Sequence, residues 1–137
     1  MLRVLLIDDD PDYAEILTLN LSDGIDIVHA ATLTDGMRIA MEGHFDATLL
    51  DLNLPDTKGG LDTIRKAVGA VPGPIIVLTG SVDDGLMVKA AKAAGATDWA
   101  SKDMAPRLLE RLIRIVAAFQ IIIDTMREKM GTEDARK

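Results

Sequence analysis

The sequence predicts a doubly wound α/β fold, in which a five-stranded parallel sheet is covered by helices on both faces. Short apolar runs of strand length alternate with longer segments whose apolar residues recur at helical spacing. Such an alternation indicates a parallel sheet with right-handed crossovers, because each helix must pack back onto the sheet. The length of 137 residues, without repeats or flexible linkers, fits a single domain.

The composition excludes several classes of protein. The formal net charge of -7 argues against a nucleic-acid or anionic-membrane surface, because phosphate binding needs clustered basic side chains and the lysines and arginines are scattered. The absence of cysteine excludes disulfides and thiolate metal sites and fits a reducing cytoplasm. The N-terminal apolar run is too short for a signal peptide, and no segment resembles a transmembrane span. We therefore expect a cytoplasmic protein that binds neither nucleic acid nor membrane.

The first half of the chain holds three expected strands and two expected helices. Leu2–Ile7 is an apolar run ended by three acids, which fits a buried strand. Asp10 suits the N-cap of the following helix, and Pro11 suits its first position. That helix continues to about Leu21 and ends before Gly24. The next elements are a strand at Ile25–Ala30, a helix at Thr34–Glu42 and a strand at Asp46–Leu50.

The second half continues the alternation. A helix at Leu61–Val71 follows a glycine-containing turn. Pro74–Thr79 reads as a strand, with its proline at the tolerated first position. An alanine-rich helix at Asp83–Ala94 and a short strand at Thr97–Ser101 come next. From about Ala105 a long helix is expected to reach at least Met130.

Polar residues follow the predicted strands. They are Asp8, Asp9, Asp51, Asn53, Thr79 and Lys102. Because the carboxyl ends of parallel strands meet at one edge of the sheet, we expect these side chains to converge on one cleft. Clustered carboxylates repel one another, and a Mg²⁺ ion with oxygen ligands relieves that repulsion. A lysine and a hydroxyl beside the cation suit an anion, so the pattern predicts phosphoryl chemistry, with Asp51 as the leading candidate residue.

Four sequence blocks in this order resemble the receiver domain of bacterial two-component response regulators. They span residues 5–11, 49–56, 74–80 and 95–102, and the resemblance covers about residues 2–119. It implies the flavodoxin-like strand order 2-1-3-4-5. It also implies a receiver domain at residues 1–120, which leaves residues 121–137 as an extension of the last helix and a charged tail.

The resemblance implies a role for each of the polar residues. Asp51 would accept a phosphoryl group from a sensor histidine kinase or a phosphotransfer protein, with no separate substrate to turn over. Lys102 would pair with the phosphoryl oxygens, Thr79 would donate its hydroxyl to them, and Trp99 would be the switch aromatic. The implied Mg²⁺ ligands are Asp8, Asp9, Asp51 and the backbone carbonyl of Asn53.

Three positions depart from the family's pattern. Gly59-Gly60 stands where one glycine is usual, so we expect a mobile turn. Asp103 replaces a proline whose peptide bond is usually cis, and a non-proline cis bond costs about 3 to 4 kcal/mol, so this bond is expected to be trans or strained. Trp99 is bulkier than the usual tyrosine or phenylalanine, and we expect it to rotate less readily or to stay outward.

The last helix carries an apolar seam spaced by three and four residues. Its members are Leu109, Leu112, Val116, Phe119, Ile123, Met126 and Met130. The first half of the seam must cover the sheet, whereas the second half has no sheet beneath it. Because an exposed apolar stripe marks an interface, we expect a homodimer through Phe119, Ile123, Met126 and Met130. A helix that folds back on its own domain is the alternative.

Two other functions stay open. A small aspartyl phosphatase of the haloacid dehalogenase type also uses Asp-x-Asp after its first strand, here Asp8 and Asp10, and would carry the phosphoryl group on Asp8. Against it, Asp12 stands where that motif has threonine or valine. The other alternative is a receiver-like interaction module that works by contact without phosphorylation. The intact set of acid, hydroxyl and lysine argues against this module.

Overall fold

The computed structural model describes residues 1–80 and 85–135. Its strands are β1 (Leu2–Ile7), β2 (Ile25–Ala30), β3 (Ala47–Asp51), β4 (Ile75–Thr79) and β5 (Asp98–Ser101). Its helices are α1 (Pro11–Asn20), α2 (Leu33–Glu42), α3 (Gly60–Ala70), α4 (Gly85–Ala93) and α5 (Pro106–Ala135). Every predicted element is present, and the strand limits differ from the prediction by at most one residue. The predicted start of the fourth helix, at Asp83, lies outside the described residues.

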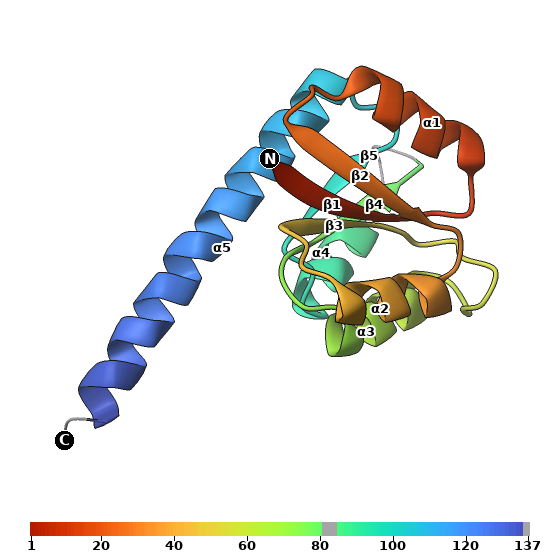
Figure 1. The fold of residues 1–137 in the computed structure, drawn as a ribbon. Helices are drawn as coiled ribbons and strands as arrows, with labels where there is room; N and C mark the ends of the chain where they lie inside the picture. Colours follow the sequence, from red (N-terminus) through yellow and green to blue (C-terminus); the bar gives the residue numbers. More distant parts are fainter. Residues whose placement is uncertain (81–84, 136–137) are drawn as a thin grey trace.

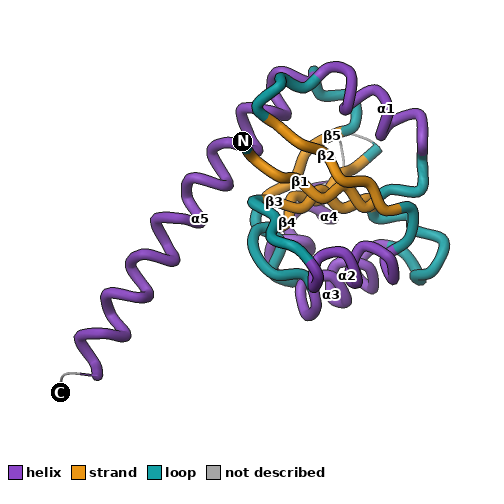
Figure 2. Tube along the Cα trace, in the orientation of Figure 1, coloured by secondary structure: helices purple, strands orange, loops and turns teal. Residues whose placement is uncertain are grey.

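The five strands form one parallel sheet in the order β2-β1-β3-β4-β5, which confirms the predicted doubly wound topology. Helices α1 and α5 cover one face of the sheet, and α2, α3 and α4 cover the other (Figures 1 and 2). Strand β3 lies at the centre and is buried on both faces, and its five residues are all buried, including the polar Thr48 and Asp51. The ends of β1, β3 and β4 therefore meet at one edge.

Local signals in the sequence explain where the helices begin. The Asp10 carboxylate accepts the backbone N–H of Asp12 at 2.9 Å and caps α1. Thr32 caps α2 in the same way, so this helix begins at Leu33, one residue before the predicted start. Gly59 precedes α3 with a φ of 83°, a left-handed conformation that glycine adopts without strain.

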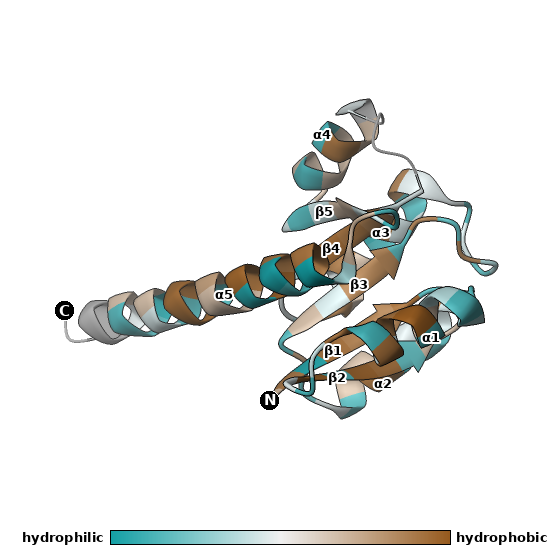
Figure 3. Ribbon diagram, turned by 90° about the horizontal axis from the view of Figure 1, so that it is seen from above, coloured by the Kyte–Doolittle hydropathy of each residue, from teal (hydrophilic) through white to brown (hydrophobic). Residues whose placement is uncertain are grey.

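Helix α5 is 30 residues long and extends well beyond the sheet (Figures 1 and 3). Its first half is buried through Leu109, Ile113 and Val116. After Val116, the exposed large apolar residues of α5 are Phe119, Ile121, Ile122, Met126 and Met130. Of the four predicted interface residues, Ile123 alone is partly buried. Among the described residues, no helix is both long enough and apolar enough to cross a membrane.

Candidate functional site

The predicted site lies at the carboxyl edge of the sheet. Asp8 directly follows β1, Asp51 is the last residue of β3, and Thr79 is the last residue of β4. The Asp8 side chain is fully buried and Asp51 is 6% exposed, so both acids are largely withdrawn from water. Two carboxylates held this way are unfavourable unless positive charge compensates them. The site therefore requires a cation or a basic side chain.

Three carboxylates lie close together at this edge. Oxygen atoms of Asp8, Asp9 and Asp51 all lie within 4.8 Å of one another, and Asp9 is exposed to solvent. Oxygen ligands at a partly open site fit Mg²⁺, which prefers carboxylates and retains several water ligands. The Asp8 Oδ1 accepts the backbone N–H of Asp10 at 2.9 Å, which fixes the orientation of its carboxylate. The donor set thus suits a hard divalent cation.

Lys102 supplies the basic side chain. Its Nζ lies 2.8 Å from Asp8 Oδ2 and 3.5 Å from Asp51 Oδ2. The Lys102 backbone N–H donates to the carbonyl of Thr79 at 2.8 Å, which ties the lysine to the end of β4. The structure contains no cis peptide bond in its described part, so the bond between Lys102 and Asp103 is trans. The lysine therefore reaches both acids although Asp103 stands where the resemblance implies proline.

The electrostatics of the site depend on burial. Burial and the negative charge of Asp8 together raise the pKa of Asp51 to about 6, against the opposing effects of Lys102 and the N–H of Asn53. For Lys102, burial by itself lowers the pKa, but the hydrogen bond with Asp8 and the charge of Asp51 prevail, so its pKa is raised. The lysine is thus charged at neutral pH. The Asp51 carboxylate is therefore mostly ionised at neutral pH, although less completely than an exposed aspartate.

A cavity of about 350 Å³ opens beside Asp51. It is lined by Asp51, Leu52, Asn53, Gly60, Leu78, Thr79, Gly80 and Met87. The Thr79 hydroxyl lies on its wall and donates to the carbonyl of Ala100 at 3.4 Å, near the upper limit for a hydrogen bond. Trp99 is half-buried and packs against the cluster that contains Val77. Asp51, Asn53 and Thr79 therefore line one cavity, whereas Trp99 lies apart from it.

Sequence reasoning missed two residues near the site. The Tyr13 ring lies 5.1 Å from Lys102 Nζ, as measured to its centroid, and packs against the charged end of the lysine. The Asp56 carboxylate accepts the backbone N–H groups of Leu33 and Thr34 at 2.9 and 2.8 Å, so it joins the loop after β3 to the start of α2. Neither contact could be predicted from hydrophobic periodicity. The free N–H groups at the start of a helix favour a nearby carboxylate, which is the one general reason to expect an acid such as Asp56 there.

The chain was compared with known families and proteins. Residues 4–114 match the family described as response regulator receiver domain. The transcriptional regulatory protein KdpE of Mycobacterium tuberculosis is 37% identical over 103 residues, which are 74% of this chain and 45% of KdpE. The cell cycle transcriptional regulator CtrA of Caulobacter vibrioides is 37% identical over 103 residues, which are 74% of this chain and 44% of CtrA. The chain thus spans about half the length of the curated relatives it matches.

A solved structure shows the same architecture. The CheY-like response regulator receiver domain protein of Methanospirillum hungatei is 28% identical and has a TM-score of 0.75. The match covers 88% of this chain and 96% of that protein's chain. The part of α5 that extends beyond the sheet falls after residue 114, where the family match ends.

Proposed function

Because this chain belongs to the response regulator receiver domain family, we propose that it accepts a phosphoryl group on the carboxylate of Asp51. The observation that carries the proposal is the setting of this one acid. Its carboxylate is nearly buried, lies 3.5 Å from Lys102 Nζ and faces a cavity of about 350 Å³. A nucleophile so placed can meet a phosphoryl donor that enters the cavity, with a positive charge already beside it.

Asp8, Asp9 and Asp51 would hold Mg²⁺, together with the backbone carbonyl of Asn53. The closeness of the three carboxylates supports this ligand set. When bound, the ion supplies positive charge that offsets the acids and the incoming phosphoryl oxygens. A single lysine beside three acids leaves an excess of negative charge, so the site without the ion repels a phosphoryl donor.

In the proposed step, an Asp51 oxygen attacks the phosphorus of a phosphohistidine on a sensor kinase or a phosphotransfer protein. A P–O bond forms and the P–N bond breaks. The imidazole nitrogen keeps the electron pair and takes up a proton from solvent. Lys102 pairs with the phosphoryl oxygens, and hydrolysis of the acyl phosphate restores Asp51. The chain thus acts as a phosphoacceptor and not as an enzyme with a separate substrate.

The signal would leave the site through Thr79 and Trp99. The hydrogen bond from Thr79 to Ala100 is long, and phosphoryl oxygens on Asp51 would offer the hydroxyl a charge-assisted hydrogen bond in its place. A turn of Thr79 toward Asp51 removes its contact with β5, where Trp99 packs. We expect the surface formed by α4 and β5, to which Trp99 belongs, to repack.

The exposed stripe of α5 would join two copies of the chain. Ile115, Phe119, Ile122 and Met126 are spaced by four, three and four residues, and each is more than half exposed. This spacing places them on one face, which a second identical helix can cover by knobs-into-holes packing. The predicted residues Ile123 and Met130 would flank that seam. We place this assembly in the cytoplasm, because a chain without cysteine forms no disulfides and so fits a reducing compartment.

The test is the intact mass of the protein after incubation with acetyl phosphate and Mg²⁺. The unmodified chain should gain one phosphoryl adduct, and Asp51→Asn should gain none. Asp56→Asn is the matched control, because it removes a carboxylate of the same loop that faces α2 and not Lys102. It should be labelled like the unmodified protein. An excess of EDTA should prevent labelling of every form.

The same experiment separates the alternatives. An adduct that persists in Asp51→Asn and disappears in Asp8→Asn would indicate the aspartyl phosphatase. No adduct on the unmodified chain, together with no binding of beryllofluoride, would indicate an interaction module that does not use phosphate.

A further inference from the structure

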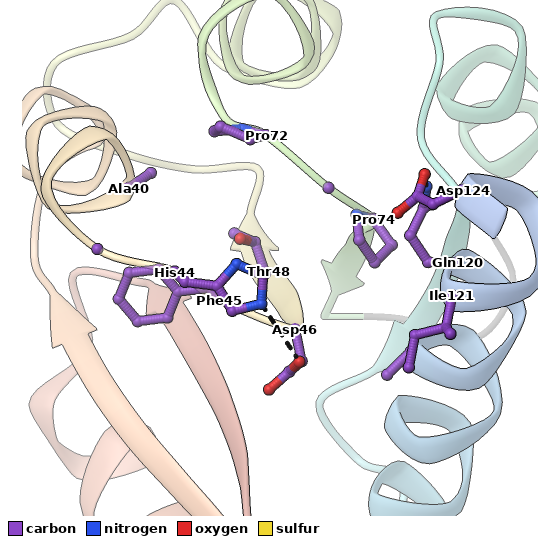
Figure 4. A pocket seen from close by; sticks show the side chains of 13 residues that line it. Ala40, His44, Phe45, Asp46, Thr48, Pro72, Pro74, Gln120, Ile121 and Asp124 are labelled. Carbon is purple, nitrogen blue, oxygen red and sulfur yellow. Dashed lines mark hydrogen bonds and ion pairs between the residues drawn. The ribbon is translucent and has the colours of Figure 1, made fainter. Parts of the chain in front are cut away.

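A second cavity, of about 250 Å³, lies beside the segments that lead into β3 and β4 (Figure 4). Asp51 is at the other end of β3, so this cavity lies at the opposite edge of the sheet. It is bounded by the end of α2, the loops before β3 and β4, and the part of α5 where this helix leaves the sheet. Its lining is Ala40, Gly43, His44, Phe45, Asp46, Thr48, Pro72, Gly73, Pro74, Ala117, Gln120, Ile121 and Asp124. We propose that this cavity binds a small organic cation, an ammonium group on a short apolar chain.

The Thr48 hydroxyl indicates that the cavity takes a hydrogen-bond donor. Thr48 lines the cavity and is 1% exposed, and its Oγ1 has no hydrogen-bond partner. A buried hydroxyl without a partner is unfavourable, and valine has nearly the same shape without this penalty. The neighbouring positions of β3 are apolar, so threonine here is an exception within the strand. A ligand that donates a hydrogen bond to this oxygen would satisfy it.

The negative charge at the cavity favours a cation. Asp46 comes from the loop before β3 and Asp124 from α5, so two carboxylates face the cavity from different elements (Figure 4). Asp46 accepts the backbone N–H of Arg3 at 2.8 Å and lies 3.7 Å from His44 Nε2. Asp124 Oδ1 accepts the amide of Gln120 at 2.9 Å. Each carboxylate keeps lone pairs for a further donor, and their charge favours a cation.

The positive groups nearby do not fill this role. The Arg3 guanidinium lies over the Phe45 ring at 4.8 Å and donates to the carbonyl of His44, so it is held outside the cavity. The His44 side chain is 88% exposed and points largely to solvent. Neither side chain lies within hydrogen-bond reach of the Thr48 oxygen. Among the described residues, those that line the cavity thus include no lysine or arginine.

The remaining lining selects the shape of the ligand. Phe45, Pro72, Pro74 and Ile121 are apolar, which suits a short hydrocarbon chain. A volume of about 250 Å³ holds only a small molecule. The carboxylates exclude an acid of the same length by repulsion, and a neutral alcohol would gain the apolar contacts without the charge-assisted hydrogen bonds. An alkylammonium ion satisfies every part of the lining.

The cavity lies where a bound ligand would affect the direction of α5. Ala117, Gln120, Ile121 and Asp124 belong to the turns of α5 that pass from the covered half of the helix to its exposed half. A bound cation would contact these residues and the loop before β3 together. It would fix the direction in which the extension leaves the domain, at a site that phosphorylation of Asp51 does not touch.

The probe is n-butylammonium, with n-butanol and n-butyrate as controls of equal length, followed by chemical shifts of backbone amides. Butylammonium should shift the amides of Thr48, Asp46 and Ile121 and saturate at millimolar concentration. Butanol should bind at least about tenfold more weakly, because it lacks the charge-assisted hydrogen bonds. Butyrate should leave the amides unchanged. Equal effects from all three compounds, or no saturable effect of butylammonium, would overturn the proposal.

Two substitutions at one position test the hydroxyl. Thr48→Val should raise the Tm by about 3 °C, because it removes an unpaired buried group, and should weaken butylammonium binding about tenfold. Thr48→Ser keeps the oxygen and should bind the probe as tightly as the unmodified chain. A valine variant that melts lower would show that the protein already satisfies this hydroxyl. That result, or undiminished binding by the valine variant, would refute the proposal.

Discussion

Replacing Asp51 with asparagine is expected to stabilise the folded chain at neutral pH in the absence of divalent cations. Burial and the charge of Asp8 raise the pKa of Asp51 from 3.8 to about 6, with Lys102 opposing. One pKa unit corresponds to about 1.4 kcal/mol, so keeping this carboxylate ionised in the fold costs about 3 kcal/mol. Asparagine has nearly the same shape without the charge. Lys102 keeps its shorter contact with Asp8, at 2.8 Å, so the variant leaves the lysine paired.

The pH dependence has a definite sign. An acid whose pKa is raised by folding binds its proton more tightly in the folded state, so a fall in pH favours folding. For the unmodified chain, this group should add free energy of unfolding as the pH falls from about 7 to about 4, most steeply around its folded pKa of about 6. The variant lacks the group. Its advantage should therefore be greatest above about pH 7 and should close near about pH 4.

Urea denaturation in EDTA measures this difference at several pH values. Asp62→Asn is the control with the opposite sign, because the N–H of Lys58 and the nearby Lys66 lower the pKa of Asp62. Its loss should destabilise the chain at neutral pH, and that effect should fade as the pH falls. The reasoning is refuted if Asp51→Asn is no more stable than the unmodified chain at about pH 7.5 without metal. An advantage that stays constant down to about pH 4 refutes it equally.

Three further predictions concern the signalling steps. Lys102→Met should slow phosphorylation of Asp51 by acetyl phosphate about 100-fold, because it removes the positive charge beside the transferred group; a time course of intact mass measures this rate. Thr79→Ala should still be phosphorylated but should lose the accompanying change in fluorescence of Trp99, which is the sole tryptophan. Phe119→Glu should convert a dimer into a monomer by light scattering, with little change in Tm, because residue 119 is 62% exposed in the single chain.

Each of these predictions has a matched control. Lys92→Met removes an exposed lysine of α4 and should not slow phosphorylation. Thr79→Ser keeps the hydroxyl and should keep the fluorescence change. Arg127→Ala lies in the same exposed part of α5 and should leave the dimer intact. A lysine variant at full rate, an alanine variant with the full fluorescence change, or an unmodified chain that is already monomeric would contradict the respective prediction.

The sequence was sufficient to predict the fold because its local signals agree with one another. Short apolar runs such as Leu2–Ile7 are most stable as buried strands. Each run is followed by a residue that ends the strand. Parallel pairing then brings Asp8 and Asp51 to one edge, so the candidate site followed from topology alone. The cap of α1 by Asp10 was equally local and was predicted correctly.

Contacts across the structure could not be predicted in this way. The bonds from Asp56 to the start of α2 join residues 22 and 23 positions apart, through two loops that have no periodicity. The cavity around Thr48 depends on where α5 leaves the sheet, and a threonine in a strand gives no sign that its hydroxyl lacks a partner. On α5, the heptad pattern put Ile123 in the predicted seam, whereas the structure leaves Ile122 exposed and Ile123 partly buried; the seam itself stays a prediction.

The most direct test of the central claim is to locate the phosphoryl group. Sodium borohydride reduces an aspartyl phosphate to homoserine, which peptide mass spectrometry can assign to one residue. After labelling with acetyl phosphate and Mg²⁺, the account predicts homoserine at position 51 and unmodified aspartate at positions 8 and 9. Homoserine at position 8 would contradict the account, because the acceptor would then be the acid that the structure pairs with Lys102 at 2.8 Å and not the one that lines the larger cavity.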